Sequence, residues 1–368
     1  IYCRSYKFDM SDSTFNNIKP GVNRAIMYIN LDENDGLQPR ITNCTFNDNL
    51  GRIEFASGDG ETVSGSSVTF SKCHIYNSFK GYSQASGLFI LGYIKSENII
   101  IEDCTFERNG GICIYQDAGS KTIYNTNIVR CTFSNNEGPS GCCIKSDKTG
   151  SFDKKIIIED CIFKYNTATS VDSNGFKHGC VQTYPGNTEF KGVNEFIGNK
   201  NIVKESISSD ASKSLGGSLT IYQTDRRNEY TISNLIFQDS YSDYYGGALG
   251  ILSYDYVGGE SSSLFVQIDN CTFINCSSKE QGGCIKFGMK LFIENRYFTD
   301  DINITNCIFT NCQSAEGGAL YFMNGDQKGD EETVIQNCTF DGCSATTTGS
   351  TIYCRSYKFD MSDSTFNN

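Results

Sequence analysis

The sequence predicts an all-β fold, a parallel β-helix with about eleven turns in each 351-residue unit. The first observation is a motif, Ile-x-x-Cys-x-Phe, that recurs about every 32 residues along the chain. The second is a Gly-Gly corner followed by a short apolar segment, which alternates with that motif. The third is the absence of a 3.6-residue apolar period, which argues against helices. Stacked sandwich domains would not repeat one side-chain pattern at this interval.

The Cys-x-Phe segment is an expected strand of each turn. The full motif starts at Ile41, Ile101, Ile128, Ile158, Ile268, Ile304 and Ile335, and weaker copies start at Met10, Phe70, Gly192 and Ile232. Cys and Phe are two residues apart and therefore share one face of an extended strand. Repeated on every turn, they predict a column of sulfur atoms and a column of aromatic rings in one core. The Asn or Asp that precedes the strand is typical of a turn.

Two further features follow this strand in each turn. The third residue after Phe is Asn or Cys at Asn49, Asn109, Asn136, Asn166, Asn199, Cys276, Cys312 and Cys343. Further along, Gly-Gly pairs begin at Gly216, Gly246, Gly282 and Gly317, and each leads into an apolar strand. Glycine permits a positive φ at a tight corner. We therefore expect three short strands per turn.

The alternation of Gly-Gly-Ala-Ile/Leu with Phe-x-x-Asn resembles the repeats of chlamydial polymorphic outer membrane proteins and of other β-helix proteins of microbial surfaces. Gly246 to Leu249 and Phe106 to Asn109 show the two motifs. The resemblance covers nearly the whole chain and implies a right-handed parallel β-helix displayed outside the cell, often in adhesins. An identical repeat after 351 residues is not a feature of that family, so the resemblance supports fold and location rather than one function.

The longest repeat is Ile1 to Asn17, which recurs letter for letter at Ile352 to Asn368. We interpret it as the start of a second 351-residue unit in a tandem array. The copy lies inside a turn, with no linker before it. We therefore expect residues 1–368 to form a single continuous solenoid whose partner is itself, continued head to tail and with lateral copies.

The composition limits which cellular compartment and which binding partners the sequence predicts. The formal charge of −12 argues against binding nucleic acid or an anionic membrane. No apolar run is long enough to span a membrane. Eighteen cysteines indicate an oxidising, extracellular or cell-surface location. Cys3 and Cys354 are one position in the array, so the cysteine count per unit is odd and at least one cannot have an intrachain partner.

Cysteine and asparagine spacing predicts modification sites. Cys276, Cys312 and Cys343 recur over three adjacent turns, so we expect them to stack at one corner and to be the disulfide site, whereas the Cys-x-Phe column is mostly buried thiols. Sequons that could carry N-glycans occur at Asn43, Asn270, Asn275, Asn303 and Asn337. Four of these asparagines directly precede a cysteine, so capping of a turn is an equally good interpretation.

The functional interpretation is a structural subunit of an extracellular filament. The alternative is an adhesin that uses long loops within residues 192–267, where Arg226, Tyr241, Tyr245 and Tyr254 are typical of interfaces. An enzyme acting on polysaccharides is third, because it would need clustered acids and bases on one face. The two histidines, His74 and His178, lie about three turns apart. We expect no catalytic residues and no cofactor.

Acidic loops give a weak case for Ca²⁺ binding and are more simply solvated surface. They contain Asp32, Glu33 and Asp35, and Asp326, Asp330, Glu331 and Glu332.

Overall fold

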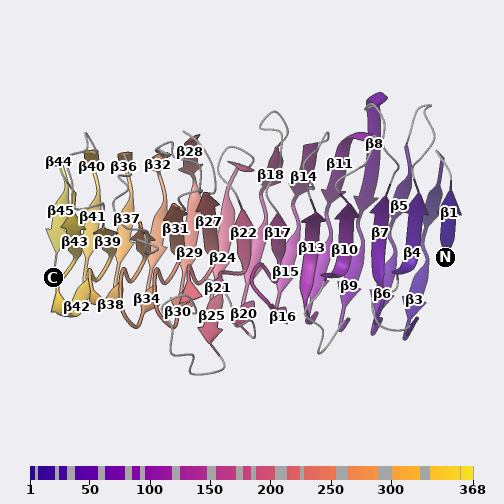
Figure 1. The fold of residues 1–368 in the computed structure, drawn as a ribbon, viewed down its shortest axis with the longest axis horizontal. Coiled ribbons are helices and arrows are strands. Elements are labelled where there is room, and N and C mark those ends of the chain that lie inside the picture. The colour runs from indigo at the N-terminus through magenta and orange to yellow at the C-terminus, as the bar shows by residue number, and fades with distance from the viewer. Residues whose placement is uncertain are drawn as a thin grey trace, which may run out of the picture. The chain divides into compact units, whose positions relative to one another are not determined.

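The computed structural model describes residues 1–4, 7–20, 25–30, 38–56, 63–78, 85–91, 96–117, 125–146, 155–170, 177–183, 188–203, 214–223, 228–253, 264–288, 301–323, 332–356 and 358–367. Every named element is a β-strand (Figure 1). The chain forms two compact units. It leaves unit 1 within β20 (Thr167–Ser170), returns to it for residues 187–194 and enters unit 2 again after Asn194. Unit 1 comprises Ile1–Thr167 and Asn187–Asn194, and unit 2 comprises Ala168–Gly186 and Glu195–Asn368.

Unit 1 is built mainly from three parallel sheets, each of which contributes one strand to a turn. The A strands are β1 (Tyr2–Arg4), β4 (Ala25–Asn30), β7 (Arg52–Ala56), β10 (Ala85–Leu91), β13 (Ile112–Asp117) and β17 (Ile144–Ser146). The B strands are β2 (Asp9–Ser11), β5 (Arg40–Thr42), β8 (Val63–Ser71), β11 (Ser96–Glu102), β14 (Asn125–Val129), β18 (Ile156–Glu159) and β23 (Thr188–Lys191). The C strands are β3 (Thr14–Asn16), β6 (Thr45–Asn47), β9 (His74–Tyr76), β12 (Thr105–Glu107), β15 (Thr132–Ser134) and β19 (Ile162–Lys164). The short β16 (Glu137–Gly138) is the first strand of a fourth sheet.

Unit 2 has the same plan with additional strands. Its A strands are β22 (Val181–Thr183), β27 (Leu219–Gln223), β31 (Leu249–Ser253), β35 (Ile285–Phe287), β39 (Leu320–Met323) and β43 (Ile352–Arg355). Its C strands are β24 (Asn194–Ile197), β29 (Leu235–Gln238), β33 (Thr272–Ile274), β37 (Ile308–Thr310), β41 (Thr339–Asp341) and β45 (Thr365–Asn367). The E strands take the place of the B strands and are β28 (Asn228–Ser233), β32 (Leu264–Asp269), β36 (Asp301–Thr305), β40 (Glu332–Gln336) and β44 (Lys358–Ser362).

A fourth, shorter strand lies between C and A in most turns of unit 2, where the sequence predicted three strands per turn. The sheet begins with β16 and β20, and its later D strands are β25 (Lys200–Val203), β30 (Tyr241–Ser242), β34 (Ser277–Ser278), β38 (Gln313–Glu316) and β42 (Ser344–Thr348). Separately, β21 (Lys177–His178) pairs with β26 (Ser214–Leu215). The polar segment before each Gly-Gly corner is long enough to form a short strand that pairs with the same segment of the next turn. Their composition resembles a loop, which is why the sequence did not reveal them.

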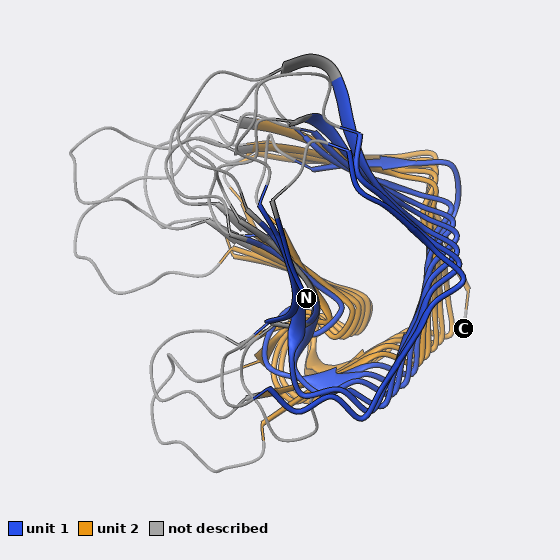
Figure 2. Cartoon of the chain, turned by 90° about the vertical axis from the view of Figure 1, so that its right-hand side faces the viewer, with its two compact units in different colours: residues 1–167, 187–194 blue, residues 168–186, 195–368 orange. Residues whose placement is uncertain are grey.

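The predicted aromatic column forms the core of each unit, inside the turns that Figure 2 shows end on. In unit 2, Phe237, Phe273, Phe309 and Phe340 pair in register, and their rings stack with centroids 4.8 to 5.0 Å apart. In unit 1, Phe106 stacks on Phe133 at 4.9 Å. These side chains are fully buried. The parallel register and the buried columns confirm the predicted β-helix.

The corners have the backbone conformation that their residues favour. The Asn or Asp before Cys-x-Phe is left-handed, with φ of 54° at Asn43 and 49° at Asn270. The second glycine of each Gly-Gly pair is required by close packing. A Cβ at Gly247 would overlap the carbonyl oxygens of Gly283 and Ser277 in the next turn.

Candidate functional site: the corner ladders and the Cys284–Cys312 bond

The cysteines of the Cys-x-Phe column hold a corner together through hydrogen bonds. The Cys73 Sγ donates to the Ser71 carbonyl at 3.2 Å and accepts from the Cys44 backbone N–H at 3.4 Å. The Cys104 Sγ repeats both contacts one turn later, with Glu102 and Cys73. All eight cysteines of the column are buried free thiols: Cys44, Cys73, Cys104, Cys131, Cys161, Cys271, Cys307 and Cys338.

Polar residues replace cysteine in this column without changing the bonding. Asn194 accepts from the Cys161 N–H and donates to the Lys191 carbonyl, both at 3.0 Å. Ser364 likewise accepts from the Cys338 N–H and donates to the Ser362 carbonyl. Burial raises the pKa of the Cys104 and Cys131 thiols well above the ordinary range, so they stay protonated. The column is therefore a structural cap.

A second ladder occupies what we call the corner position, the third residue after the C-strand Phe or its equivalent. In unit 1 this position holds Asn49, Ser78, Asn109, Asn136 and Asn166, all buried. Asn136 Nδ2 donates to the Phe106 carbonyl one turn earlier at 3.0 Å. Asn136 Oδ1 accepts from the Asn109 N–H, also at 3.0 Å. Each amide thus pairs both an N–H and a carbonyl of the preceding turn.

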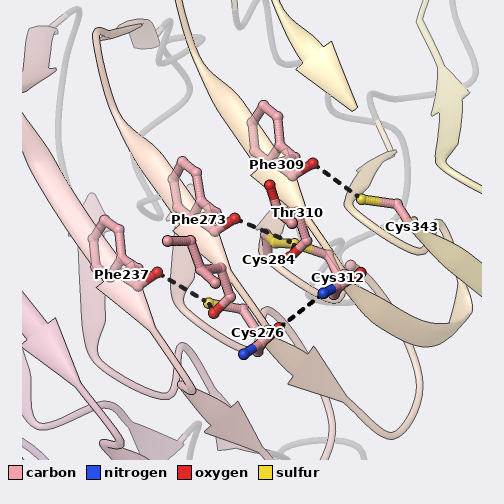
Figure 3. The surroundings of a disulfide bond; sticks show 12 residues. Phe237, Phe273, Cys276, Cys284, Phe309, Thr310, Cys312 and Cys343 are labelled. Atoms are coloured by element: carbon pink, nitrogen blue, oxygen red, sulfur yellow. Dashed lines mark hydrogen bonds between the residues drawn. A yellow bond between two sulfur atoms is a disulfide. The ribbon is translucent and has the colours of Figure 1, made fainter. Parts of the chain in front are cut away.

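In unit 2 the corner position holds the buried Asn199 in the first turn and then Ser240, Cys276, Cys312 and Cys343, the last three being the predicted disulfide corner. They occupy equivalent places in successive turns (Figure 3). Their sulfur atoms lie 3.6, 3.9 and 3.5 Å from the carbonyl oxygens of Phe237, Phe273 and Phe309. Cys312 is disulfide-bonded, but its partner is Cys284 and not a member of the column. Cys276 and Cys343 are free thiols, and burial raises the pKa of Cys276 to about 12.

Cys284 occupies what we call the facing position, the residue that follows a Gly-Gly pair. Facing positions in unit 2 are Ser218, Ala248, Cys284 and Ala319. The second glycine packs against the residue after the corner position of the next turn, at Gly217 with Tyr241, Gly247 with Ser277, Gly283 with Gln313 and Gly318 with Ser344. Each facing residue therefore meets the corner residue of the next turn. Ser218 and Ser240 bear this out with hydroxyls 2.8 Å apart.

Sequence reasoning missed Cys284 because it considered cysteines at equal spacing. The contact between a facing residue and the corner residue of the next turn, which we call the diagonal, depends on the D strand. The sequence of the D strand did not predict a strand there. A search for cysteines directly after Gly-Gly pairs would have marked this residue.

Four of the five sequon asparagines are exposed left-handed corner residues, and their side chains form ladders. Asn43, Asn270, Asn275 and Asn337 donate through Nδ2 to Asp12, Asn234, Asp239 and Asn306, at 2.6, 2.8, 3.1 and 2.7 Å. Asn303 lies within β36 and is half-buried. Glycan attachment stays a prediction. The positive φ values place these asparagines at the turns, and their side chains bond to side chains of the preceding turn.

The described part of residues 192–267 uses its polar groups internally. Asp243 accepts hydrogen bonds from the Val203 N–H at 2.7 Å and the Tyr241 hydroxyl at 2.9 Å, and it pairs with the Lys279 ammonium at 2.6 Å. Burial alone would raise the Asp243 pKa, but these contacts outweigh burial and lower it. Tyr245 is buried. Arg226, Arg227 and Tyr254 to Tyr256 lie outside the described residues.

Groups that could serve catalysis are dispersed among the described residues. His74 stacks on Tyr76 with ring centroids 4.5 Å apart, and its Nε2 lies 3.4 Å from the Glu107 carboxylate. His178 is in β21. The described residues contain no group of three His, Cys, Asp or Glu side chains that could hold a metal ion. Of the acidic-loop residues, Glu332 begins β40 and the others lie outside the described ranges.

In the part of the chain that the structure covers, no helix has the length and apolarity needed to cross a membrane.

Comparison with known proteins places the fold. Residues 25–214 match the family model described as a right-handed β-helix region. Among solved structures, a mutant of the PL6 family alginate lyase AlyGC aligns over 98% of this chain and 86% of that chain, with 9% identity and a TM-score of 0.15. A likeness of that size carries no functional argument. No curated protein matches the sequence.

Proposed function

The chain belongs to the right-handed β-helix family, and on that basis we propose that it is a structural subunit of an extracellular or cell-surface filament. In this proposal, successive 351-residue units continue one solenoid, with the duplicated stretch as the junction.

The observation that carries the proposal is how the two copies of the duplicated stretch pair. In the first copy, Tyr2 stacks on Tyr28 and Phe15 on Phe46, both in the following turn. In the second, Tyr353 stacks on Tyr321 and Phe366 on Phe340, both in the preceding turn. One sequence therefore matches a neighbouring turn on either side. Joined through this stretch, two units would keep the tyrosine and phenylalanine stacks unbroken.

A chain of two units tests this proposal. Residues 18–368 would be appended after Asn368, so that the second copy gains a following turn. At the ~4.8 Å spacing of strands, eleven added turns predict an increase in length of about 53 Å. Electron microscopy and small-angle scattering would measure that increase against the parent chain. Two rods joined at variable angles would contradict the proposal.

A matched variant examines the junction itself. In the two-unit chain, the junction phenylalanine that is Phe366 in the parent would lie inside the core. Phe366→Asp in the two-unit chain should introduce a bend or a protease-sensitive site at the junction, because a buried unpaired carboxylate is costly. The same substitution at the exposed Phe366 of the parent should have little effect.

An extracellular location is supported by the Cys284–Cys312 bond and by the likeness of the Gly-Gly-Ala and Phe-x-x-Asn repeats to surface proteins. Labelling of intact producing cells with an impermeant reagent would test it. Exclusive labelling after lysis would contradict it.

A further inference from the structure

Cys142 and Cys143 are adjacent residues of unit 1 whose side chains turn toward each other. Both side chains are fully buried. The structure has both as thiols, and their sulfur atoms lie 4.0 Å apart. In an extended strand, neighbouring side chains point to opposite faces. The short distance between the sulfur atoms therefore requires a departure from strand geometry.

That departure is a bend that includes both cysteines and directly precedes β17. Gly141 leads into the bend with a φ of 71°, a conformation that glycine adopts without strain. The Cys142 and Cys143 carbonyls accept hydrogen bonds from the Cys113 and Ile114 N–H groups of the preceding turn, each at 2.9 Å. The backbone of the bend is therefore held in place, and the sulfur atoms approach each other by rotation of the two side chains.

We propose that Cys142 and Cys143 form a vicinal disulfide when the chain folds under oxidising conditions. The sulfur atoms of a disulfide are about 2.05 Å apart, so the pair has to close a gap of about 2 Å. Burial is compatible with this reaction, because Cys284 and Cys312 are just as buried and are bonded to each other. Oxidation takes place before the turns close over the sulfur atoms. This inference does not depend on the filament proposal.

The oxidant in this reaction is a small organic disulfide, R–S–S–R. The thiolate of one cysteine attacks a sulfur atom of that molecule and forms a mixed disulfide. The released R–S⁻ takes up the proton that the cysteine lost. The thiolate of the other cysteine then attacks the cysteine sulfur of the mixed disulfide, which forms the Cys142 Sγ–Cys143 Sγ bond and releases a second R–SH. In total, the pair loses two electrons and two protons, and R–S–S–R gains them.

The vicinal bond is easier to reduce than the Cys284–Cys312 bond. The Cα atoms of Cys284 and Cys312 are 6.0 Å apart, within the range that disulfides favour. Adjacent residues have Cα atoms only about 3.8 Å apart, so a bond between their side chains is strained. It also encloses no loop of chain and adds almost no chain-entropy stabilisation to unit 1. The pair is therefore a redox-sensitive site rather than a stabilising bond.

Peptide mass spectrometry of the full-length chain tests the bond. The chain is refolded with oxidised and reduced glutathione until Cys284–Cys312 has formed, then denatured, alkylated with N-ethylmaleimide and digested with trypsin. The tryptic peptide 131–145 contains three cysteines. We expect one maleimide group, on Cys131, and a loss of two hydrogen atoms from the other two cysteines. Three maleimide groups, or a cross-link to the peptide that contains Cys113, would overturn the proposal.

Substitutions in the same peptide separate the pair from its neighbour. Cys142→Ser and Cys143→Ser should each abolish the loss of two hydrogen atoms and leave both remaining cysteines alkylated. Cys131→Ser is the matched control, because Ser364 already makes the same hydrogen bonds at an equivalent position of the column. That variant should keep the loss and carry no maleimide group. Disappearance of the loss in Cys131→Ser would assign the bond to Cys131 and reject the vicinal pair.

Refolding in glutathione buffers of increasing reducing strength measures how easily the bond is reduced. Reducing strength is expressed as the squared concentration of reduced glutathione divided by the concentration of oxidised glutathione. The value that half-reduces the Cys142–Cys143 bond should be about tenfold lower than the value that half-reduces Cys284–Cys312, because the vicinal bond is strained. Half-reduction of both bonds at the same value would reject the pair as a redox-sensitive site.

Discussion

The corner position distinguishes the two units more clearly than any other feature. In unit 1 it holds buried amides such as Asn109 and Asn136, whose hydrogen bonds to the preceding turn measure about 3.0 Å. In unit 2 a buried amide, Asn199, holds only the first corner. Ser240 and three cysteines follow it, and the sulfur atoms of Cys276 and Cys343 lie 3.5 to 3.6 Å from the same class of carbonyl. The corner has the same backbone arrangement in both units, but the side-chain hydrogen bonds at the corner are stronger in unit 1 than in unit 2.

The difference concerns how a repeated corner can be stabilised. An amide satisfies a donor and an acceptor of the preceding turn at once, so the ladder is self-contained. A thiol is a weak donor and leaves more of the stabilisation to other bonds. Unit 2 supplies a disulfide at one corner and a hydroxyl pair at another, Ser218 with Ser240. Stability at the corners of unit 2 therefore depends on oxidation, and that of unit 1 does not.

Removing one amide from unit 1 should have the largest effect. Asn136→Ala deletes the donor to the Phe106 carbonyl and the acceptor for the Asn109 N–H, both buried. Each unpaired buried group costs about 1–3 kcal/mol, so we expect a loss of about 4 kcal/mol in the free energy of unfolding. Urea unfolding would measure it. Cys276→Ala in unit 2 is the counterpart and should cost only about 1 kcal/mol; equal losses would contradict the comparison.

Loss of the disulfide should be nearly as costly to unit 2. The bond closes a loop with a sequence separation of 28 residues, for which chain entropy gives about 3.6 kcal/mol. Cys284→Ser with Cys312→Ser should lower the free energy of unfolding by roughly this amount. Reductant should destabilise the parent and leave the double variant unchanged. Equal sensitivity of both proteins to reductant would show that the bond does not stabilise the unit.

Much of the fold was readable because a β-helix repeats its chemistry on every turn. The columns of Ile101, Cys104 and Phe106 and their equivalents are local patterns, so spacing alone placed them. The Cys284–Cys312 pair was not readable, because it joins a Gly-Gly corner to the next turn across a D strand.

The disulfide between a facing position and the corner position of the next turn should also form when it is engineered at another turn. Ala248 faces Cys276 as Cys284 faces Cys312, since Gly247 and Gly283 make equivalent contacts. Ala248→Cys should therefore form a second disulfide and stabilise the chain by about 2 kcal/mol, less than full chain entropy predicts. Thiol titration of the oxidised, denatured variant should find one fewer free thiol than in the parent. One more free thiol would show that the diagonal geometry is not shared.

The smallest expected effect concerns Asp243, which joins the Val203 N–H, the Tyr241 hydroxyl and the Lys279 ammonium in unit 2. Its folded-state pKa lies below the ordinary 3.8, so the unfolded chain takes up the proton first as pH falls. The stabilisation is thus complete well above pH 3.8 and is lost as pH falls through the folded-state pKa. Asp243→Asn should cost roughly 1–2 kcal/mol at pH 7, with the deficit shrinking on acidification. Unfolding free energies of parent and variant between pH 7 and pH 3 would measure it. Asp341→Asn, at an exposed residue, is the control, and a pH-independent Asp243→Asn deficit would show that the charge is not responsible.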